Sequence, residues 1–277
     1  YYYNGGNALP VVKAKAIPQT VTITRYVGED RYKTADLIAE SHLKPNKVVV
    51  SGKTFADGLS AGYLAYTKNA NLVYDECKGT NGLETTVVGG DVKINGAGVK
   101  VLSGADRYAT NLEVLKECIK GAKKLIITSG KDWADGVSVS TVRYPVMMVG
   151  DYLTIKQASF LDKQSDLEYV ILGGDSVVSK DIERQLADIG KVTRLAGLDR
   201  YDTSSKIADL FYPNADTVIL ANAWADGLVA SNLGDYPILL VNQYTNESAK
   251  AYIKKHAIKK VYVLGGISDD ILADIFN

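Results

Sequence analysis

Gly197-Leu-Asp-Arg-Tyr-Asp-Thr203 is the stretch that decides the fold, because the chain contains it in three versions. The other two are Gly28-Glu-Asp-Arg-Tyr-Lys-Thr34 and Gly104-Ala-Asp-Arg-Tyr-Ala-Thr110. The spacing between copies is 76 residues from the first to the second and 93 from the second to the third. These periods exceed the roughly 20–50 residues of solenoid and propeller repeats. Each repeat is therefore long enough to form a small domain.

Two further motifs follow each copy in the same order. The first is an aromatic residue followed by Ala-Asp-Gly, at Phe55, Trp133 and Trp224. The second is an apolar run that ends in two glycines, the last of them at positions 90, 174 and 266. Apolar runs of strand length alternate with stretches of helical spacing, which is typical of βαβ units around a parallel sheet. The sequence thus predicts a triplicated α/β module with parallel sheets.

The third copy gives the clearest expected elements. Strands are predicted at 192–196, 217–221, 237–241 and 260–264, and helices at 201–211 and 246–256. In the first copy, 75–84 and 91–98 are too short and glycine-rich for the corresponding helices. The expected divisions are an extended N-terminal connector (1–20), a trimmed first repeat (21–98), a second repeat (99–190) and a third repeat (191–277).

Composition limits the partners. Lys plus Arg number 32 and Asp plus Glu number 32, so an anionic partner must be met by local pockets, and nucleic acid is not expected. No apolar run reaches the ~20 residues that span a bilayer, which argues against membrane insertion. Cys77 and Cys118 have neither metal-site nor disulfide-framework spacing and are expected to be free thiols. The chain begins at Tyr1 without Met, so we expect any signal sequence to have been removed or omitted.

The Asp-Arg pair of each copy is the first candidate site. Asp30, Asp106 and Asp199 are predicted N-caps, since a carboxylate there accepts backbone N–H groups and faces the positive end of the helix dipole. The arginines that follow lie at a helix start beside a strand end, where open α/β sheets bind ligands. Two interpretations remain open. Arg31, Arg107 and Arg200 either clamp an anion or hold the repeats together.

The other two motifs also allow two interpretations. The aromatic rings could stack on a sugar or plug the space between units, and Asp57, Asp135 and Asp226 beside them are predicted N-caps. The paired glycines could form a phosphate-binding turn or a tight βα turn, and the tight turn is favoured because no P-loop lysine follows. These glycines are Gly89, Gly90, Gly173, Gly174, Gly265 and Gly266.

Catalysis has no support in the sequence. His42 and His256 do not recur at equivalent positions, and no repeated nucleophile, metal-binding or cofactor motif is present. We therefore predict a protein that is not an enzyme and needs no cofactor or metal.

Taken together, the three motif sets resemble the cell wall-binding repeat 2 family of clostridial surface and S-layer-associated proteins, over residues 21–277. The resemblance implies three Toprim-like, Rossmann-like units packed as a pseudo-threefold trimer. It also implies a secreted protein at the cell wall or S-layer of a Gram-positive bacterium. Its partner would be an anionic secondary cell wall polysaccharide, with other S-layer proteins as further partners.

The resemblance also implies which residues face the polymer. They are Arg31, Arg107, Arg200, Arg25, Arg194, Ile238, Leu239 and Leu240. To these we add as candidate ligand contacts the phrase tyrosines and the motif aromatic residues, Tyr32, Tyr108, Tyr201, Phe55, Trp133 and Trp224. The copies differ at some of these places. The second has Val101 where the others have Arg25 and Arg194, and Val146-Met147-Met148 where the third has the Ile-Leu-Leu strand.

We therefore predict a wall-binding module that anchors a larger surface protein. Two alternatives remain. One is an α/β enzyme or binder of nucleotides or sugar phosphates that uses the strand-Gly-Gly turns. The other is an S-layer tile that only assembles with itself.

Overall fold

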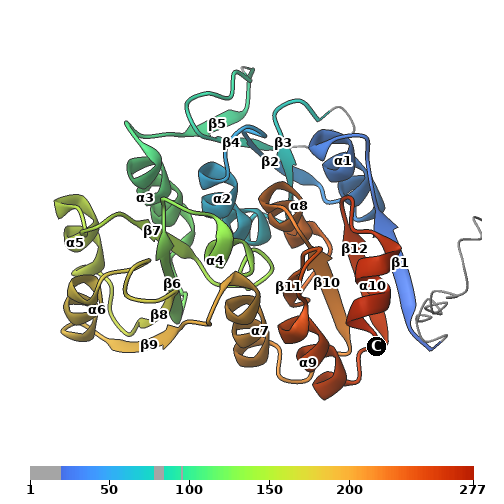
Figure 1. The fold of residues 1–277 in the computed structure, drawn as a ribbon. Helices are drawn as coiled ribbons and strands as arrows, with labels where there is room; N and C mark the ends of the chain where they lie inside the picture. The colour runs from blue at the N-terminus through green and yellow to red at the C-terminus, as the bar shows by residue number, and fades with distance from the viewer. Residues whose placement is uncertain (1–19, 78–83, 95) are drawn as a thin grey trace, which may run out of the picture.

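The computed structural model describes residues 20–77, 84–94 and 96–277. The expected connector lies outside these residues except for Thr20. The described chain forms three four-stranded parallel sheets with helices packed on them, as Figure 1 shows. This confirms the predicted α/β class and the threefold repetition.

The strands of the three sheets are equivalent in order. The first sheet runs β3 (Ala70–Tyr74), β2 (Asn46–Val50), β4 (Thr85–Val88), β5 (Val99–Leu102). The second runs β7 (Val146–Val149), β6 (Lys124–Ser129), β8 (Glu168–Leu172), β9 (Lys191–Leu195). The third runs β11 (Ile238–Leu240), β10 (Thr217–Ala221), β12 (Lys260–Leu264), β1 (Thr22–Tyr26). We call each sheet with its helices the first, second and third unit.

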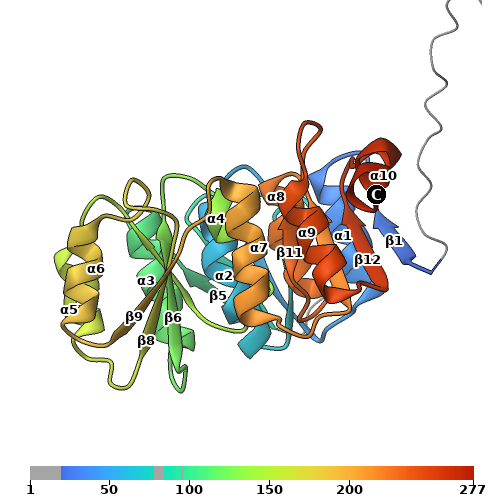
Figure 2. The same ribbon diagram turned by 60° about the horizontal axis from the view of Figure 1, so that its bottom comes forward.

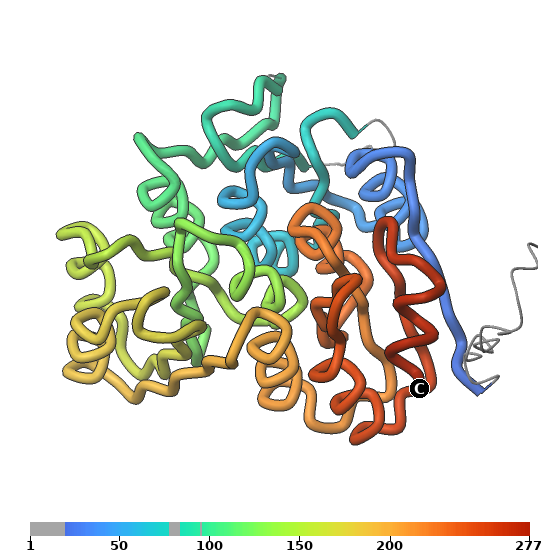
Figure 3. Tube along the Cα trace, in the orientation of Figure 1, coloured from blue at the N-terminus to red at the C-terminus, as the bar shows by residue number. Residues whose placement is uncertain are grey.

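Each sheet takes its last strand from the beginning of the next sequence repeat. β5 and β9 open the second and third repeats but pair with β4 and β8 of the preceding ones. This exchange of strands between repeats is cyclic, because β1 near the start of the chain pairs with β12 near its end. The first and last strands therefore lie side by side and close the ring (Figure 3). The sheets cut across the divisions expected from the sequence, which placed 22–26 with the first repeat.

The helices fall into three equivalent sets. Those that begin with the Asp-Arg-Tyr phrase are α1 (Arg31–Ser41), α3 (Arg107–Cys118) and α7 (Arg200–Phe211). Those that begin with the aromatic-Ala-Asp-Gly motif are α2 (Ala56–Thr67), α4 (Ala134–Val137) and α8 (Trp224–Val229), with the 3-10 turn η1 (Ala230–Asn232) after α8. The second unit adds α5 (Ile155–Leu161) and α6 (Lys180–Ala187), and the third adds α9 (Glu247–His256) and α10 (Asp269–Ile275).

The first unit contains no helix in its described residues between β3 and β4, or between β4 and β5. Residues 78–83 and 95 of the segments expected to be trimmed lie outside the described part of the chain. In the third repeat the predicted strands 217–221 and 260–264 coincide with β10 and β12. The predicted helices differ from α7 and α9 by one residue at the start, and the predicted strands 192–196 and 237–241 differ from β9 and β11 by one residue at both ends. No helix among the described residues has the length and apolar character to cross a membrane.

The motif helices α2, α4 and α8 gather at the centre of the molecule, as Figures 1 and 2 both show. Their glycines explain the contact. A Cβ on Gly136 would lie 2.6 Å from Leu59 Cδ2, and one on Gly58 would lie 2.7 Å from Leu228 Cδ1. The third member of the ring is Gly227, where a Cβ would lie 2.5 Å from a methyl carbon of the residue after Gly136. In each unit, the side chain of the residue after the motif glycine thus packs against the motif glycine of a neighbouring unit.

This cyclic contact lies in one continuous core. A single buried cluster contains apolar residues of all three sheets, whereas the outer faces of the sheets have smaller clusters of their own. Units of this size bury little surface alone, so a shared core stabilises all three. The predicted packing of the units against one another is confirmed.

The inner edge strands β3, β7 and β11 are buried, so their free backbone groups need partners. Side chains provide them. Asn232 bonds the N–H and C=O of Leu72 at 2.8 and 2.9 Å, and Asn111 bonds the C=O of Val146 at 2.8 Å and the N–H of Met148 at 3.0 Å. Because Asn232 belongs to the third unit and Leu72 to the first, the hydrogen bonds of Asn232 also join two units.

A double-mutant cycle tests the central contact. Gly136→Ala should lower the free energy of unfolding by about 1–2 kcal/mol, because its Cβ overlaps Leu59. In a Leu59→Ala background the same substitution should be neutral or stabilising, since the overlap is gone and alanine favours the helix. Urea unfolding of the four proteins measures this coupling. Gly174→Ala is the control, because its Cβ would meet nothing within 4 Å. Equal effects of Gly136→Ala in both backgrounds would contradict the contact.

Closure of the ring by β1 is tested at Thr24. Thr22 N–H donates to Lys259 C=O at 2.8 Å and Tyr26 C=O accepts from Gly265 N–H at 3.0 Å, so by alternation the Thr24 N–H faces β12. Thr24→Pro should cost about 1–3 kcal/mol of unfolding free energy and speed amide exchange in β12. Thr24→Val retains the N–H and should change stability by less than about 0.5 kcal/mol. Slow exchange in β12 of the proline variant would show that β1 does not close the third sheet.

Candidate functional site

The seven-residue phrase forms the same local structure in all three copies. The Thr34 hydroxyl accepts a hydrogen bond from the Gly28 N–H at 3.0 Å, and Thr110 and Thr203 do the same for the glycines that open their copies. A Cβ on Gly28 would lie 2.4 Å from the Thr34 backbone N. The phrase therefore needs glycine at its start, because the strand end turns directly onto the first helical turn.

The aspartates of the phrase are N-caps, as predicted. Asp30 and Asp106 each accept the backbone N–H three residues later at 2.8 Å, and Asp199 accepts those of Tyr201 and Asp202 at 2.9 and 2.8 Å. The caps fix the start of each helix and hence the position of the arginine that follows.

The arginines lie at the junctions between units, and each stacks on the motif aromatic of the preceding unit. The guanidinium carbon lies 4.9 Å from the Trp224 ring centroid for Arg31, 5.5 Å from Phe55 for Arg107 and 5.0 Å from Trp133 for Arg200. Such cation–π contacts contribute roughly 0.5–1 kcal/mol at exposed sites. Both sequence motifs thus meet at one place, and it is repeated three times around the molecule.

Hydrogen bonds hold these guanidinium groups only in part. The Nη1 groups of Arg31 and Arg107 donate to the C=O of Gly52 and Gly130 at 2.8 and 2.5 Å, and Arg200 lies 3.6 Å from an oxygen of Asp132. Arg31 and Arg107 are exposed, and 37% of the Arg200 side chain remains accessible. A guanidinium has five N–H donors, so each junction presents cationic donors to solvent.

The predicted capping role of Asp57, Asp135 and Asp226 is wrong. They lie inside the first helical turn, and the N-cap positions are Phe55, Trp133 and Ala223 without a side-chain cap. Their carboxylates instead contact the first glycine of the Gly-Gly turn. Burial raises the pKa of all three, and for Asp57 burial and Asp91 raise the pKa to about 6 although Arg107 opposes the shift. Each therefore places a poorly solvated carboxyl group near a junction arginine.

The first glycines of the Gly-Gly turns have positive φ, +106° at Gly89, +92° at Gly173 and +71° at Gly265, which favours glycine. A Cβ on Gly89 would lie 2.3 Å from an oxygen of Asp57. The second glycines have open space around them. The turns of the second and third units are thus tight βα turns, and in all three units a carboxylate lies against the first glycine.

The phrase tyrosines pack on strand ends rather than standing free. A Cβ on Gly52 would lie 2.4 Å from the Tyr32 ring, and one on Gly130 would lie 2.5 Å from the Tyr108 ring. Tyr32 also meets Tyr74 edge-on, with ring centroids 6.0 Å apart. These two rings, and Tyr201 in the third unit, are half-buried.

The strand arginines are tied to their own sheets. Arg25 donates to the C=O of Ile267 at 2.8 Å and pairs with Asp269, and Arg194 bonds the C=O of Gly173 at 2.8 Å and Glu183 at 2.9 Å. Only 15% of the Arg194 side chain is exposed. These contacts fix the turn after the Gly-Gly pair, so we do not include Arg25 and Arg194 in the contact surface proposed below.

The Ile238-Leu239-Leu240 strand requires a correction. It is β11, and its side chains are at most 2% exposed. A polymer cannot reach them in this structure. Their role here is in the core, where the Leu240 N–H donates to the Ser204 hydroxyl at 3.1 Å. The fully apolar sequence of this strand already predicted burial.

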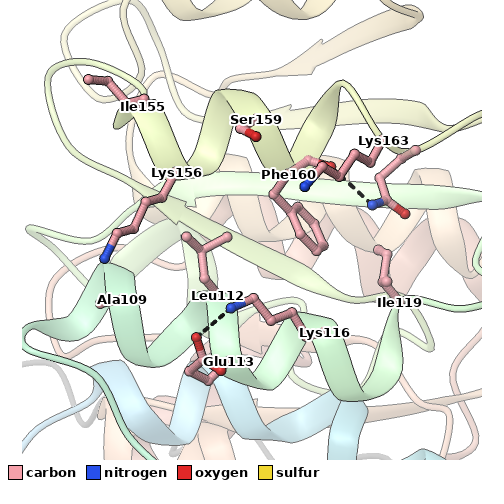
Figure 4. A pocket seen from close by; sticks show the side chains of 11 residues that line it. Ala109, Leu112, Glu113, Lys116, Ile119, Ile155, Lys156, Ser159, Phe160 and Lys163 are labelled. Carbon is pink, nitrogen blue, oxygen red and sulfur yellow. Dashed lines mark hydrogen bonds and ion pairs between the residues drawn. The ribbon is translucent and has the colours of Figure 1, made fainter.

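A groove of about 650 Å³ lies between α3 and α5 of the second unit (Figure 4). Leu112, Ile119 and Phe160 give it an apolar floor, and Lys156 and Lys163 stand at its rim. The equivalent groove between α7 and α9 measures about 400 Å³ and is lined by ion-paired side chains. The sequence analysis singled out neither groove, and the two differ too much to belong to the repeated arrangement.

The sequence analysis also missed residues that the structure makes prominent. Asn111 and Asn232 form hydrogen bonds with free backbone groups of edge strands. Tyr152 and Tyr244 are exposed and precede equivalent helices. The tyrosines carry a usable signal, because each lies three residues before the first residue of the third helix in its repeat.

In the part of the chain that the structure describes, we find no arrangement of side chains suited to catalysing a covalent reaction. No group of His, Cys, Asp or Glu there is arranged to hold a metal ion. Cys77 and Cys118 are free, and burial raises the pKa of each thiol to about 12, which leaves them protonated and unreactive. His256 contacts Asp209 at 2.8 Å inside the third unit, away from the repeated junctions.

Comparison with known proteins identifies the family. The family model described as Cell wall binding domain 2 (CWB2) matches residues 25–97, 101–183 and 194–271. The chain belongs to this family and carries three tandem copies of its domain. It is therefore a cell wall-binding chain of the cell surface.

Curated relatives and solved structures agree with this assignment. The chain is 29% identical over 180 residues to the N-acetylmuramoyl-L-alanine amidase LytC of Bacillus subtilis (strain 168), covering 61% of the chain and 36% of that protein. It is 26% identical over 296 residues to the amidase enhancer of the same organism, covering 95% of the chain and 41% of that protein. Cwp8 from Clostridium difficile has a TM-score of 0.79 and 25% identity, over 93% of this chain and 52% of that one. The chain thus spans about a third to a half of the length of these proteins.

The half-buried carboxyl group of Asp57 at the first junction predicts a pH effect. Because Asp57 has a pKa of about 6 in the folded protein against 3.8 as the ordinary value, the folded state binds the extra proton between about pH 4 and 6. Its contribution to stability is therefore present at low pH and lost as the pH rises through 6. Asp57→Asn should raise the unfolding free energy at pH 7.5 by about 1–2 kcal/mol and change it little at pH 4.

Denaturant unfolding at both pH values measures this effect, and exposed Asp188→Asn is the control. If the substitution changes the unfolding free energy by the same amount at both pH values, the pKa of Asp57 is not raised in the folded protein.

Proposed function

We propose that this member of the CWB2 family is a non-catalytic module that attaches a surface protein to an anionic secondary cell wall polysaccharide of a Gram-positive bacterium. One observation carries the proposal: three guanidinium–aromatic pairs, equivalent in the three units, stand partly exposed at the unit junctions. A repeated site on the protein matches a partner that is itself a repeating polymer.

The chemistry of the junction suits an anionic sugar polymer. A guanidinium offers planar N–H donors to phosphate or carboxylate groups, and the ring beneath it adds an apolar face. Stacking on Phe55, Trp133 or Trp224 also limits the rotamers of the arginine, which lowers the ordering cost of binding. Since the chain has no net charge, these local sites supply the attraction.

Binding through several junctions explains how weak sites could retain a protein on a wall. Once one junction holds a polymer strand, the next binds at a raised effective concentration. The alternative of a phosphate ligand at the Gly-Gly turns is disfavoured, because Asp57 and its equivalents place carboxylates against those turns. The amidase activity named for one relative belongs to a protein of which this chain covers 36%, and we assign none of it here.

Substitution of the junction arginines tests the proposal. Arg31→Ala, Arg107→Ala and Arg200→Ala should each weaken sedimentation with purified clostridial cell walls by about three- to tenfold, and more in combination. Lysine at these positions should restore binding only in part, because an ammonium lacks the planar fork. The melting temperature of each variant should fall by only a few degrees, the loss expected for one exposed cation–π contact.

The control is Arg184→Ala, which removes an exposed arginine of α6 that pairs within its own helix. It should leave wall binding unchanged. If a folded triple variant still sediments like the parent, the junctions are not the polymer site. If binding and melting temperature fall in strict proportion, the arginines only hold the units together.

A further inference from the structure

Two exposed tyrosines occupy the same place in two copies of the module. Tyr152 lies between β7 and α5 with 75% of its surface accessible, and Tyr244 lies between β11 and α9 with 85% accessible. Each precedes its helix by three residues. A single exposed ring needs no explanation, but the recurrence of an exposed tyrosine at equivalent positions of two copies points to a surface function.

Hydrogen bonds hold the chain on both sides of the Tyr244 ring. The Asn242 side-chain oxygen accepts the N–H groups of Tyr244 and Thr245 at 2.6 and 2.9 Å, and its Nδ2 donates to the Thr245 C=O at 3.0 Å. Asn246 Nδ2 returns to the Asn242 C=O at 2.9 Å. The loop is therefore fixed while its ring stands in solvent.

The Tyr152 loop is fixed by different contacts. Asp151 pairs with Lys131 at 2.6 Å, and its C=O accepts the Ser179 hydroxyl at 3.3 Å. Thr154 and Gln157 form a reciprocal capping box immediately afterwards. Two loops of unlike sequence thus each hold an exposed tyrosine at the equivalent position, and a fixed backbone lowers the cost of ordering on binding.

From these observations we infer that Tyr152 and Tyr244 are stacking platforms for pyranose rings of the wall polymer, one on the second unit and one on the third. The inference rests on the proposed function and adds to it a contact with the neutral faces of the sugars. A tyrosine ring is a flat apolar face with a polar tip, which suits a sugar ring that is apolar on its face and hydroxylated at its edge.

The position of the platforms suits the same partner as the arginines. Both loops follow the carboxyl ends of strands, the edge at which the Asp-Arg-Tyr helices begin. Gly150, two residues before Tyr152, lies against Tyr108 of that phrase, because a Cβ on Gly150 would lie 3.4 Å from the Tyr108 hydroxyl. One polymer strand can therefore meet cationic and aromatic groups along one edge of a unit.

The first unit has no such platform in its sequence. The segment that follows β3, from 75 to 84, contains no aromatic residue. The inference therefore assigns two stacking platforms to the chain, against three arginine junctions.

The test compares truncation with conservative replacement. Tyr152→Ala and Tyr244→Ala should each weaken sedimentation with purified clostridial cell walls by about fivefold, and the double variant by more than about tenfold. Tyr152→Phe and Tyr244→Phe should bind within about twofold of the parent, because the ring remains. All should melt within a degree or two of the parent, since the rings are exposed.

The matched control is Leu43→Ala, which removes a 73% exposed apolar side chain after α1, at the other edge of the sheets. It should bind like the parent. A folded double alanine variant with parental binding overturns the platforms and leaves the proposed function intact. A parent that does not sediment with the walls overturns the proposed function, and the platforms fall with it.

Discussion

The contact on which the structure depends is the insertion of one branched side chain against one glycine, made three times around the centre. Leu59, Val137 and Leu228 each pack where the neighbouring unit has Gly136, Gly227 and Gly58. A Cβ at any of these glycines would overlap the neighbour, so close approach of α2, α4 and α8 requires the glycine of the aromatic-Ala-Asp-Gly motif. The motif thus serves packing between units, because its glycine allows the close approach of helices that forms the shared core.

The same helix starts bring the aromatic rings to the junctions, where the arginines of the next unit cover them. Packing between units is therefore compatible with the proposed recognition role of Arg31, Arg107 and Arg200. One face of each guanidinium stacks on a ring, while its remaining donors face solvent. The stacking that joins two units also holds the cation in a fixed position, so unit assembly creates the candidate sites.

The three units are similar in construction and unequal in surface. The first lacks the outer helices in its described residues and has no aromatic residue after β3, whereas the second and third each present an exposed tyrosine there. The grooves with apolar floors also differ in place, since the second unit has one between α3 and α5 and the third has one between α9 and the C-terminal residues. The third unit depends on β1 to complete its sheet. The contacts in the inner core are thus repeated in all three units, whereas the outer surfaces of the units differ.

Sequence alone determined the features that depend on neighbouring residues. The number of copies, the order of strands and helices, the caps at Asp30, Asp106 and Asp199 and the burial of apolar strands all follow from local spacing and residue type. The sequence left open whether the arginines join units or bind an anion, and it misplaced Asp57 and its equivalents as caps. It also could not show that β1 pairs with β12, because that pairing joins opposite ends of the chain. Tertiary structure showed that the arginines contact the neighbouring unit, that Asp57 and its equivalents lie inside their helices, and that β1 pairs with β12. The first and last of these depend on which groups from different repeats come within contact distance, and no local pattern encodes that.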